Sequence, residues 1–232
     1  MMTVFWALLV AFLVVITAGA MIVYLRQRDQ TRREAIEALA ARRGWSLMIT
    51  SQSLGRPSIM RLSSRSGPAW QAETKRFEAR SGTKAQNITE YHSTATSWSD
   101  NIMIICSRDS DSGSDAANGL GGTEHGTIEE GDIRGLVGQD IGESIPHLQA
   151  WPVHDQMIIY ASNDPSIRAD LGDLAKVFLE WEPLKSGPRG QPVAILGSGG
   201  LRVRLRHAVN GADGLERFVD YSTGLYRLFS RP

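Results

Sequence analysis

The sequence lacks the residue patterns on which most recognisable chemistry depends. Cys106 is the single cysteine, so the chain cannot form an internal disulfide, which fits a reducing compartment. No Cys-x-x-Cys or His-Glu-x-x-His occurs, and these are common spacings of zinc ligands. Phosphate-binding glycine motifs and the Gly-x-Ser-x-Gly elbow of serine hydrolases are also missing. We therefore expect no metal, no cofactor and no assigned catalytic residue.

An excess of charge is also missing. The 25 Lys and Arg residues are matched by 25 Asp and Glu residues, so the formal net charge is zero at pH 7. Nucleic-acid-binding domains usually carry a basic excess or a long basic face, and we expect no nucleic-acid partner here. The hydrophobic content of 42% is that of an ordinary globular protein, and 232 residues suffice for one sizeable core or two small ones.

One long uncharged run is present at the N-terminus, from Val4 to Leu25. In a helix this run would be ~33 Å long, which matches the thickness of a hydrocarbon core of about 30 Å. A cleaved secretory signal normally begins with positive charge, whereas Met1, Met2 and Thr3 have uncharged side chains. Ala18-Gly19-Ala20 resembles a cleavage site but lies inside the run. The pattern predicts a transmembrane helix over residues 3–25.

Basic and aromatic residues flank this run and indicate an orientation. Arginines follow the run, and only the terminal amine precedes it. Because basic flanks stay in the cytoplasm, we expect a single-pass bacterial inner-membrane protein with its N-terminus out and its soluble domain cytoplasmic. The arginines either set this topology only or also bind anionic lipid. The interface and topogenic residues are Trp6, Tyr24, Arg26, Arg28, Arg32 and Arg33.

A basic juxtamembrane helix or stalk is expected over residues 26–44. Thr31-Arg32-Arg33-Glu34 has the form of a capping box that would begin a helix, and Gly44 is a natural C-terminal stop. Nothing between residues 26 and 31 interrupts helix, so the alternative is one unbroken helix that continues from the apolar run. Either form would lead directly into a soluble domain over residues 45–232.

The first part of this domain reads as β-structure. Residues 45–106 contain short β-branched or aromatic segments that Gly, Pro and Ser separate. The apolar run 101–106, NIMIIC, predicts a central strand that is buried on both faces. Residues 107–127 are rich in Ser, Asp and Gly, which predicts a flexible loop. Residues 128–153 give mixed signals.

The last third alternates strands and helices. The run 155–161, DQMIIYA, predicts a second buried strand, and Asn163 or Asp164 would cap a helix with Pro165 in its first turn. A hairpin turned at Ser198-Gly199-Gly200 follows, and then a C-terminal amphipathic helix capped by Asp213. The predicted fold class is α+β, with an antiparallel or mixed sheet and two to three packed helices.

Two groups of side chains are candidates for function. Cys106 ends an apolar strand and either packs in the core or forms a site with His125, His154 and the 107–127 loop. The second group alternates with apolar residues, so that all three guanidinium groups lie on one sheet face. This face is either a plain exposed face whose charges discourage edge pairing, or a contact for an anionic partner. The three residues are Arg202, Arg204 and Arg206.

The stretch 39–45, LAARRGW, resembles uncharacterised bacterial single-pass membrane proteins in which a short helix ends in Gly-Trp before a β-rich soluble domain. The likeness also takes in residues 152–229, and it implies no enzyme activity, cofactor or catalytic residue. We expect a membrane-tethered binding or accessory module, such as a scaffold, a sensor or a subunit, with the lipid bilayer and a membrane-associated protein as partners. The alternative is a membrane-anchored enzyme with its site around Cys106, His125 and His154. The oligomeric state is left open.

Overall fold

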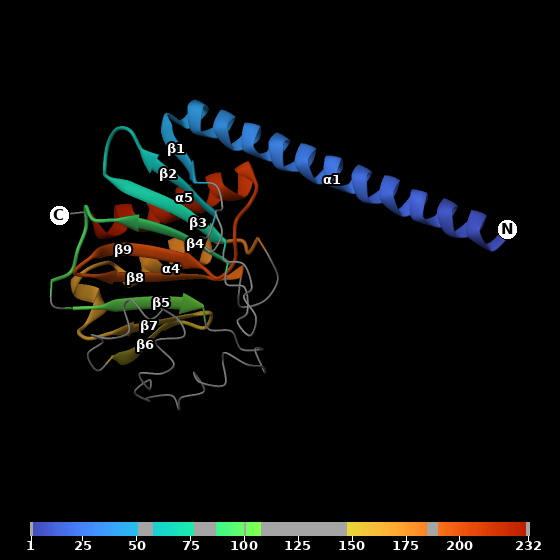
Figure 1. Ribbon diagram of the computed structural model, residues 1–232. Helices are drawn as coiled ribbons and strands as arrows, with labels where there is room; N and C mark the ends of the chain where they lie inside the picture. The colour runs from blue at the N-terminus through green and yellow to red at the C-terminus, as the bar shows by residue number, and fades with distance from the viewer. Residues whose placement is uncertain are drawn as a thin grey trace.

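A computed structural model describes residues 2–50, 58–76, 87–99, 101–107, 148–184 and 190–230, with side chains from residue 12 onward. A long N-terminal helix leads into an α+β domain and projects away from it (Figure 1). The elements are α1 (Met2–Arg43), β1 (Trp45–Thr50), β2 (Ser58–Ser64), β3 (Trp70–Arg76), β4 (Asn87–Ser93), β5 (Met103–Ser107), β6 (Gln149–His154), β7 (Met157–Ala161), the 3-10 helix η1 (Pro165–Ile167), α4 (Leu171–Leu179), β8 (Pro192–Gly197), β9 (Gly200–Leu205) and α5 (Ala212–Phe229).

The described residues form a single sheet of nine strands in the order β1-β2-β3-β4-β9-β8-β5-β7-β6, and every pair in it is antiparallel. The C-terminal hairpin β8–β9 lies in the middle and joins the N-terminal meander to β5, β7 and β6. β5 therefore lies between β8 and β7, and its residues Met103–Cys106 are all buried. The prediction of a central strand buried on both faces is confirmed.

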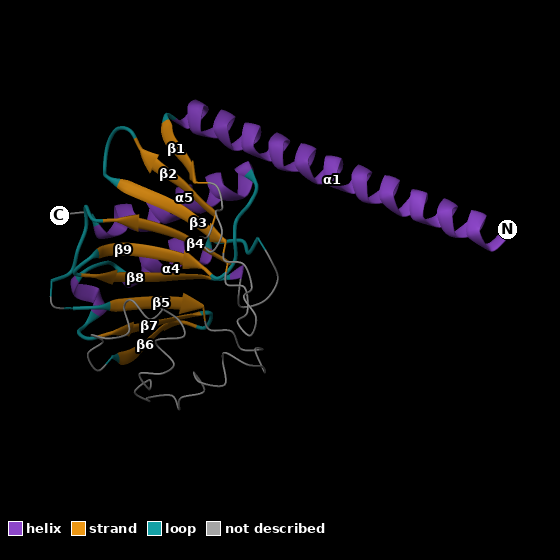
Figure 2. Cartoon of the chain, in the orientation of Figure 1, coloured by secondary structure: helices purple, strands orange, loops and turns teal. Residues whose placement is uncertain are grey.

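The helices α4 and α5 cover one face of the sheet (Figure 2). The main core lies between them and the strands, and α5 contributes the fully buried Phe218 and Leu225 while α4 contributes Leu174. Apolar side chains on one stripe of each helix make this burial possible. A smaller cluster, which includes Ile104 and Tyr160, lies on the other face. The predicted α+β class is confirmed, and the sheet is antiparallel.

The β8–β9 hairpin confirms the turn predicted around Ser198-Gly199-Gly200. Gly197 pairs with Gly200, so Ser198 and Gly199 form the two-residue turn. Gly200 has φ +102°, and a Cβ atom at this position would lie 2.1 Å from the carbonyl oxygen of Ser93. Only glycine combines this backbone conformation with so close an approach of β4.

Two helix starts differ from the prediction. The segment after β7 forms only the 3-10 turn η1, in which Asp164 accepts a hydrogen bond from the backbone N–H of Ser166. A second cap follows, because Asp170 accepts a hydrogen bond from the backbone N–H of Asp173 and begins α4. The α-helix therefore begins at Leu171, and Ile167, the last residue of η1, is 73% exposed.

The N-cap of the C-terminal helix lies two residues before the expected cap, Asp213. Gly211 is the N-cap of α5, and it forms no side-chain capping hydrogen bond. Asp213 lies in the first turn instead, where a carboxylate interacts favourably with the helix dipole.

The first helix is continuous, as in the alternative left open by the sequence. Thr31 lies inside α1, and its hydroxyl donates to the backbone oxygen of Gln27 at 3.0 Å, so it does not cap a new helix. The helix ends at Arg43, and Gly44 follows with φ +65°. The predicted stop is confirmed.

The prediction of a transmembrane helix over residues 3–25 is wrong, and so is the single-pass inner-membrane location that depended on it. Among the described residues, no helix has both the length and the apolar character that a membrane span requires. In α1 the uncharged stretch ends at Leu25, and the charged residues Arg26, Arg28 and Asp29 follow. Charged side chains such as these are costly in hydrocarbon.

Candidate functional site

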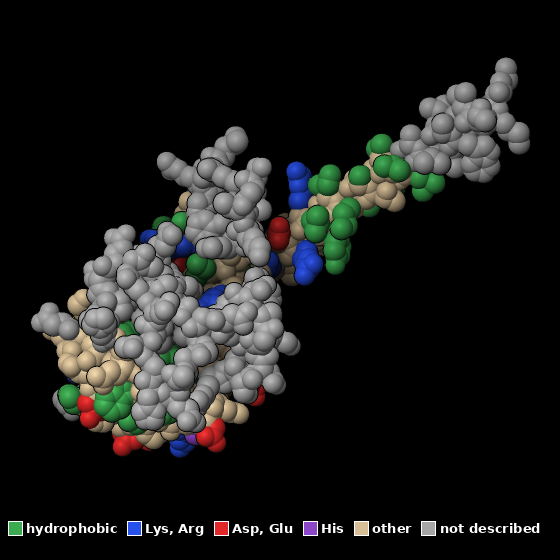
Figure 3. Space-filling model, turned by 90° about the horizontal axis from the view of Figure 1, so that it is seen from below, with side chains coloured by type: hydrophobic (Ala, Val, Ile, Leu, Met, Phe, Trp, Pro, Cys, Tyr) green, Lys and Arg blue, Asp and Glu red, His purple; other side chains and the backbone are tan. Residues whose placement is uncertain are grey.

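Exposed apolar side chains on α1 are the most conspicuous surface feature of the described residues (Figure 3). Their exposed fractions range from 45% to 68%. Elsewhere in the described chain only Met48 and Ile167 are large apolar side chains with comparable exposure. Contiguous exposed apolar surface of this kind usually marks an interaction site. We call these residues the α1 apolar segment: Phe12, Leu13, Val14, Val15, Ile16, Met21, Ile22, Val23, Tyr24 and Leu25.

The α1 apolar segment is exposed around the whole helix. Consecutive residues such as Phe12, Leu13 and Val14 point about 100° apart, and all three are more than half exposed. A helix that packs on its own domain presents one apolar stripe and one polar face. This segment has no such polarity, so a surface that covers it has to enclose most of the helix.

The other end of α1 is fixed to the domain by apolar packing. Ile36, Leu39 and Ala40 recur at helical spacing, and each is no more than 4% exposed in the main core. These contacts place the last turns of α1 against β1 and α5. The α1 apolar segment is therefore carried on a helix whose base is held in place.

Ion pairs reinforce this base. Arg42 Nη2 lies 2.7 Å from Glu216 Oε2 on α5, and Arg43 Nε lies 3.2 Å from Glu216 Oε1. Arg43 also pairs with Asp220, and its guanidinium carbon lies 5.2 Å from the ring centroid of Trp45. Burial raises the pKa of Asp220, although the positive charge of Arg43 opposes this rise. Exposed pairs contribute only ~0.2–1 kcal/mol each, so they orient α1 more than they stabilise it.

The residues predicted to lie at a membrane interface have varied settings. Arg32 Nε donates to the backbone oxygen of Asn210, so this arginine belongs to the base of α1. Arg26, Arg28 and Arg33 are exposed on the helix, and so is Tyr24. Trp6 lies outside the side chains that the structure describes. The topogenic role predicted for these residues depended on a membrane-spanning helix.

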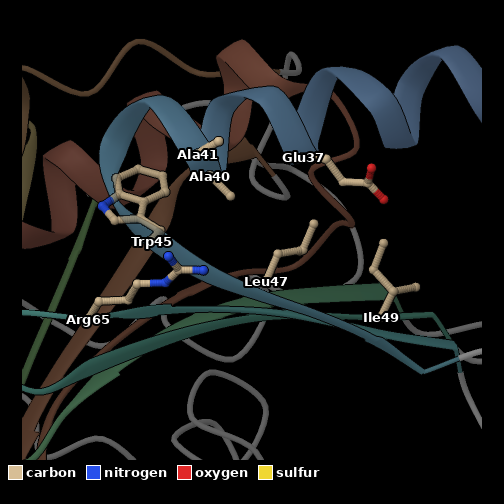
Figure 4. Close-up of a pocket in the computed structure, with 7 residues that line it drawn as sticks. All are labelled: Glu37, Ala40, Ala41, Trp45, Leu47, Ile49 and Arg65. Atoms are coloured by element: carbon tan, nitrogen blue, oxygen red, sulfur yellow. The ribbon is translucent and has the colours of Figure 1, made fainter.

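A groove of about 390 Å³ lies between α1 and β1 (Figure 4). Leu47 and Ile49 point from β1 towards α1, and Glu37 and Arg65 lie near opposite ends of the groove (Figure 4). The side chains that line it are Glu37, Ala40, Ala41, Trp45, Leu47, Ile49 and Arg65. Sequence reasoning missed this site, because its walls come from segments that only the tertiary fold brings together.

Cys106 has the properties of a core residue in the described structure. Its side chain belongs to the smaller apolar cluster and is only 4% exposed. Burial raises the pKa of this thiol to about 12, although Arg206 lowers it in part. A thiol with this pKa is almost fully protonated near neutral pH, whereas a nucleophilic cysteine needs the thiolate.

The histidines of the alternative site are not gathered around this thiol. His154 is exposed at the end of β6, and its Nδ1 accepts a hydrogen bond from the backbone N–H of Gln156 at 3.2 Å. His125 and the loop predicted at 107–127 lie outside the described residues, apart from Ser107, which ends β5. Within the described ranges, no group of three or more His, Cys, Asp or Glu residues is placed to hold a metal ion.

Arg202 and Arg204 lie on β9, whereas Arg206 follows the last residue of this strand. Arg204 is 8% exposed, and its Nε donates to Glu90 Oε2 on β4 at 2.6 Å. Arg202 and Arg206 also have interaction partners. β9 lies between β4 and β8, so the suggestion that these charges protect a sheet edge is wrong. The missing signal was Glu90, which lies directly opposite Arg204 in the β4–β9 register.

The described structure is thus an α+β domain that carries the α1 apolar segment on its first helix. A groove lies between the last turns of this helix and β1. Comparison of the chain with protein-family models, curated proteins and solved structures finds no match. The resemblance to single-pass proteins with a Gly-Trp helix end therefore stays a prediction.

Proposed function

We propose that this chain is a binding module, a scaffold or accessory subunit, and that the α1 apolar segment is its contact surface for a protein partner. The exposure of ten large apolar side chains on one helix supports this proposal. Such exposure is costly for a chain that remains alone in water, because each side chain loses the gain of burial.

The magnitude of this gain indicates the kind of partner surface. Complete burial of one large apolar side chain contributes ~1.5–3 kcal/mol, so half-exposed side chains still have roughly 1 kcal/mol each to gain. Burial of the whole segment then contributes on the order of 10 kcal/mol. Association itself costs roughly 4–15 kcal/mol, so contact with one face of the helix would be insufficient. The partner should provide a groove or a helical bundle that surrounds α1.

The fixed base of α1 assists such binding. Ile36, Leu39 and Ala40 pack the last turns of α1 against the domain. The direction of α1 relative to the domain is therefore fixed in the unbound protein. A preorganised helix loses less conformational entropy on binding than a free peptide would.

The test is isolation of the native full chain in a mild non-ionic detergent, followed by identification and quantification of any protein that accompanies it. A stoichiometric protein should be retained by the unaltered chain and lost from a variant with Val15→Glu and Ile22→Glu. The matched control is Ile167→Glu, which places the same charge at an exposed apolar position away from α1. This control should retain the partner.

Two results would contradict the proposed function. One is a chain that is isolated without any stoichiometric protein. The other is a partner that stays bound to the doubly substituted variant, because the contact surface would then lie elsewhere. Far-UV circular dichroism of each variant establishes that α1 and the domain remain folded.

A further inference from the structure

The first strand of the sheet is an edge that lacks the usual protection. β1 (Trp45–Thr50) pairs with β2 on one side, and no described strand pairs with its other side. Its six residues, WSLMIT, include no charge and no proline. The opposite edge, β6, contains Pro152 and a register shift between Pro152 and His154. Proline and bulges are common devices that prevent edge pairing, and the β6 edge carries both, whereas β1 carries no proline and pairs with β2 without a register shift.

β1 also exposes an apolar side chain on each of its faces. Met48 is 47% exposed on the face that points away from the helices. On the other face, Leu47 and Ile49 are partly buried and line the groove under α1 (Figure 4). A strand that pairs with β1 would place alternate side chains in this groove and beside Met48.

The groove has a positively charged side chain near one end of β1 and a negatively charged side chain near the other end. Arg65 lies near the Trp45 end and Glu37 lies near the Ile49 end (Figure 4). Among the described residues, neither side chain forms an ion pair with another side chain. In an antiparallel pair of identical strands the ends are exchanged, so each Arg65 would approach the Glu37 of the other copy.

We propose that β1 is a self-association edge, which pairs antiparallel with β1 of a second copy of this chain around a twofold axis at Met48. Met48 then lies opposite its own counterpart, and Leu47 lies opposite Ile49 of the other copy. Residues directly opposite in an antiparallel pair share one sheet face, so Leu47 and Ile49 of each copy enter the groove of the other. The interface is isologous, and one Arg65–Glu37 ion pair forms at each of its two ends.

The charge order favours a second copy over an unrelated extended segment. One groove presents a cation at one end and an anion at the other, and β1 itself is uncharged. A second copy supplies the complementary charge at each end, because its own Glu37 lies beside Arg65 and its own Arg65 lies beside Glu37. This edge is separate from the α1 apolar segment, so either interface can fail while the other holds.

Disulfide cross-linking tests the register of this pairing. Directly opposite residues have Cβ atoms roughly 4.5–5.5 Å apart, close to the separation in a disulfide. The full chain with Met48→Cys, in a mild non-ionic detergent, should therefore become largely a covalent dimer under mild oxidation. The native thiol of Cys106 is 4% exposed and should not take part.

Position 50 supplies the matched control. Thr50 is exposed and lies on the same face of the same strand as Met48, but the two copies of residue 50 would be ~13 Å apart along the strands. The Thr50→Cys chain alone should remain monomeric on a non-reducing gel. A mixture of Thr50→Cys and Ser46→Cys chains should form the mixed dimer, because residues 46 and 50 are opposite each other.

Charge reversal tests the groove independently of new cysteines. Glu37→Arg and Arg65→Glu should each weaken the dimer by roughly two- to fivefold per lost ion pair, as measured by sedimentation. The double variant should restore the affinity, because each pair is re-formed with the charges exchanged. A chain that stays monomeric, equal cross-linking at positions 48 and 50, or a dimer that depends on the α1 apolar segment alone would overturn this inference. Displacement of the second copy by an unrelated protein strand would overturn it too.

Discussion

The adjacent glycines Gly199 and Gly200 should respond very differently to the same substitution. At Gly200, φ is +102°, and an added Cβ would lie 2.1 Å from the backbone oxygen of Ser93 and 2.9 Å from the Cα of Thr94. Both contacts are with backbone, so no side chain can rotate away to relieve them. At Gly199 the nearest atom to an added Cβ is a guanidinium nitrogen of Arg202 at 4.0 Å. That position has space.

The structure sets the magnitude of each effect. A residue held in a sparsely populated backbone conformation costs ~1–3 kcal/mol, and overpacking typically costs ~1–3 kcal/mol more. Gly200→Ala should therefore lower the free energy of unfolding by roughly 2–6 kcal/mol. Gly199→Ala should change it by no more than about 0.5 kcal/mol, as surface substitutions usually do. The first change corresponds to a fall in Tm of at least about 4 °C for a domain of this size.

Urea and thermal unfolding, followed by tryptophan fluorescence, measure both variants. Trp45 and Trp181 are buried in the main core, so their emission reports unfolding of the domain. A Gly200→Ala variant as stable as the unaltered chain, or a Gly199→Ala variant that is the more destabilised of the two, would contradict this prediction. Either result would mean that β4 does not approach Gly200 closely.

Three further perturbations test the interior of the sheet. Thr89→Val removes a buried hydroxyl that accepts the backbone N–H of Val209 at 2.8 Å, and it should cost about 1–3 kcal/mol of unfolding free energy in urea titration. Glu90→Gln removes the charge that faces Arg204 and should cost about 1.5–3 kcal/mol by the same measurement, whereas an unchanged midpoint would show that this pair adds nothing. The Cys106 thiol should react with an aromatic disulfide reagent only after unfolding. Because its pKa is raised to about 12, its contribution to stability is present at neutral pH and is lost as pH rises from about 9 towards 12, which urea midpoints across that range would reveal.

The prediction of secondary structure succeeded where the local pattern was strong. β5 and β7 follow from continuous apolar runs, and α5 follows from its apolar stripe. The prediction failed at the start of α4, where two caps compete over a few residues. Asp164 and Asp170 both cap a turn, and only packing of the following residues decides which turn continues as an α-helix.

The interaction sites were less accessible to sequence reasoning. The alternation correctly placed Arg202 and Arg204 on a β-strand, although Arg206 lies beyond its end, and it could not reveal that Glu90 on a distant strand faces Arg204. The uncharged run at the N-terminus was recognised, yet the described part of α1 does not support its interpretation as a membrane span. The groove at the base of α1 was missed entirely.

Sequence alone determined that β5 and β7 are strands and that α5 is a helix, because the order of apolar and polar side chains carries the period of each element. It also determined the position of the β8–β9 turn, since residue 200 has to be glycine. Only the tertiary structure decided that β1 is an edge strand of the described sheet while β9 is internal, and that Arg65 and Glu37 share a groove. Strand order and such contacts depend on pairings between residues far apart in the chain, and local side-chain patterns do not encode those partners.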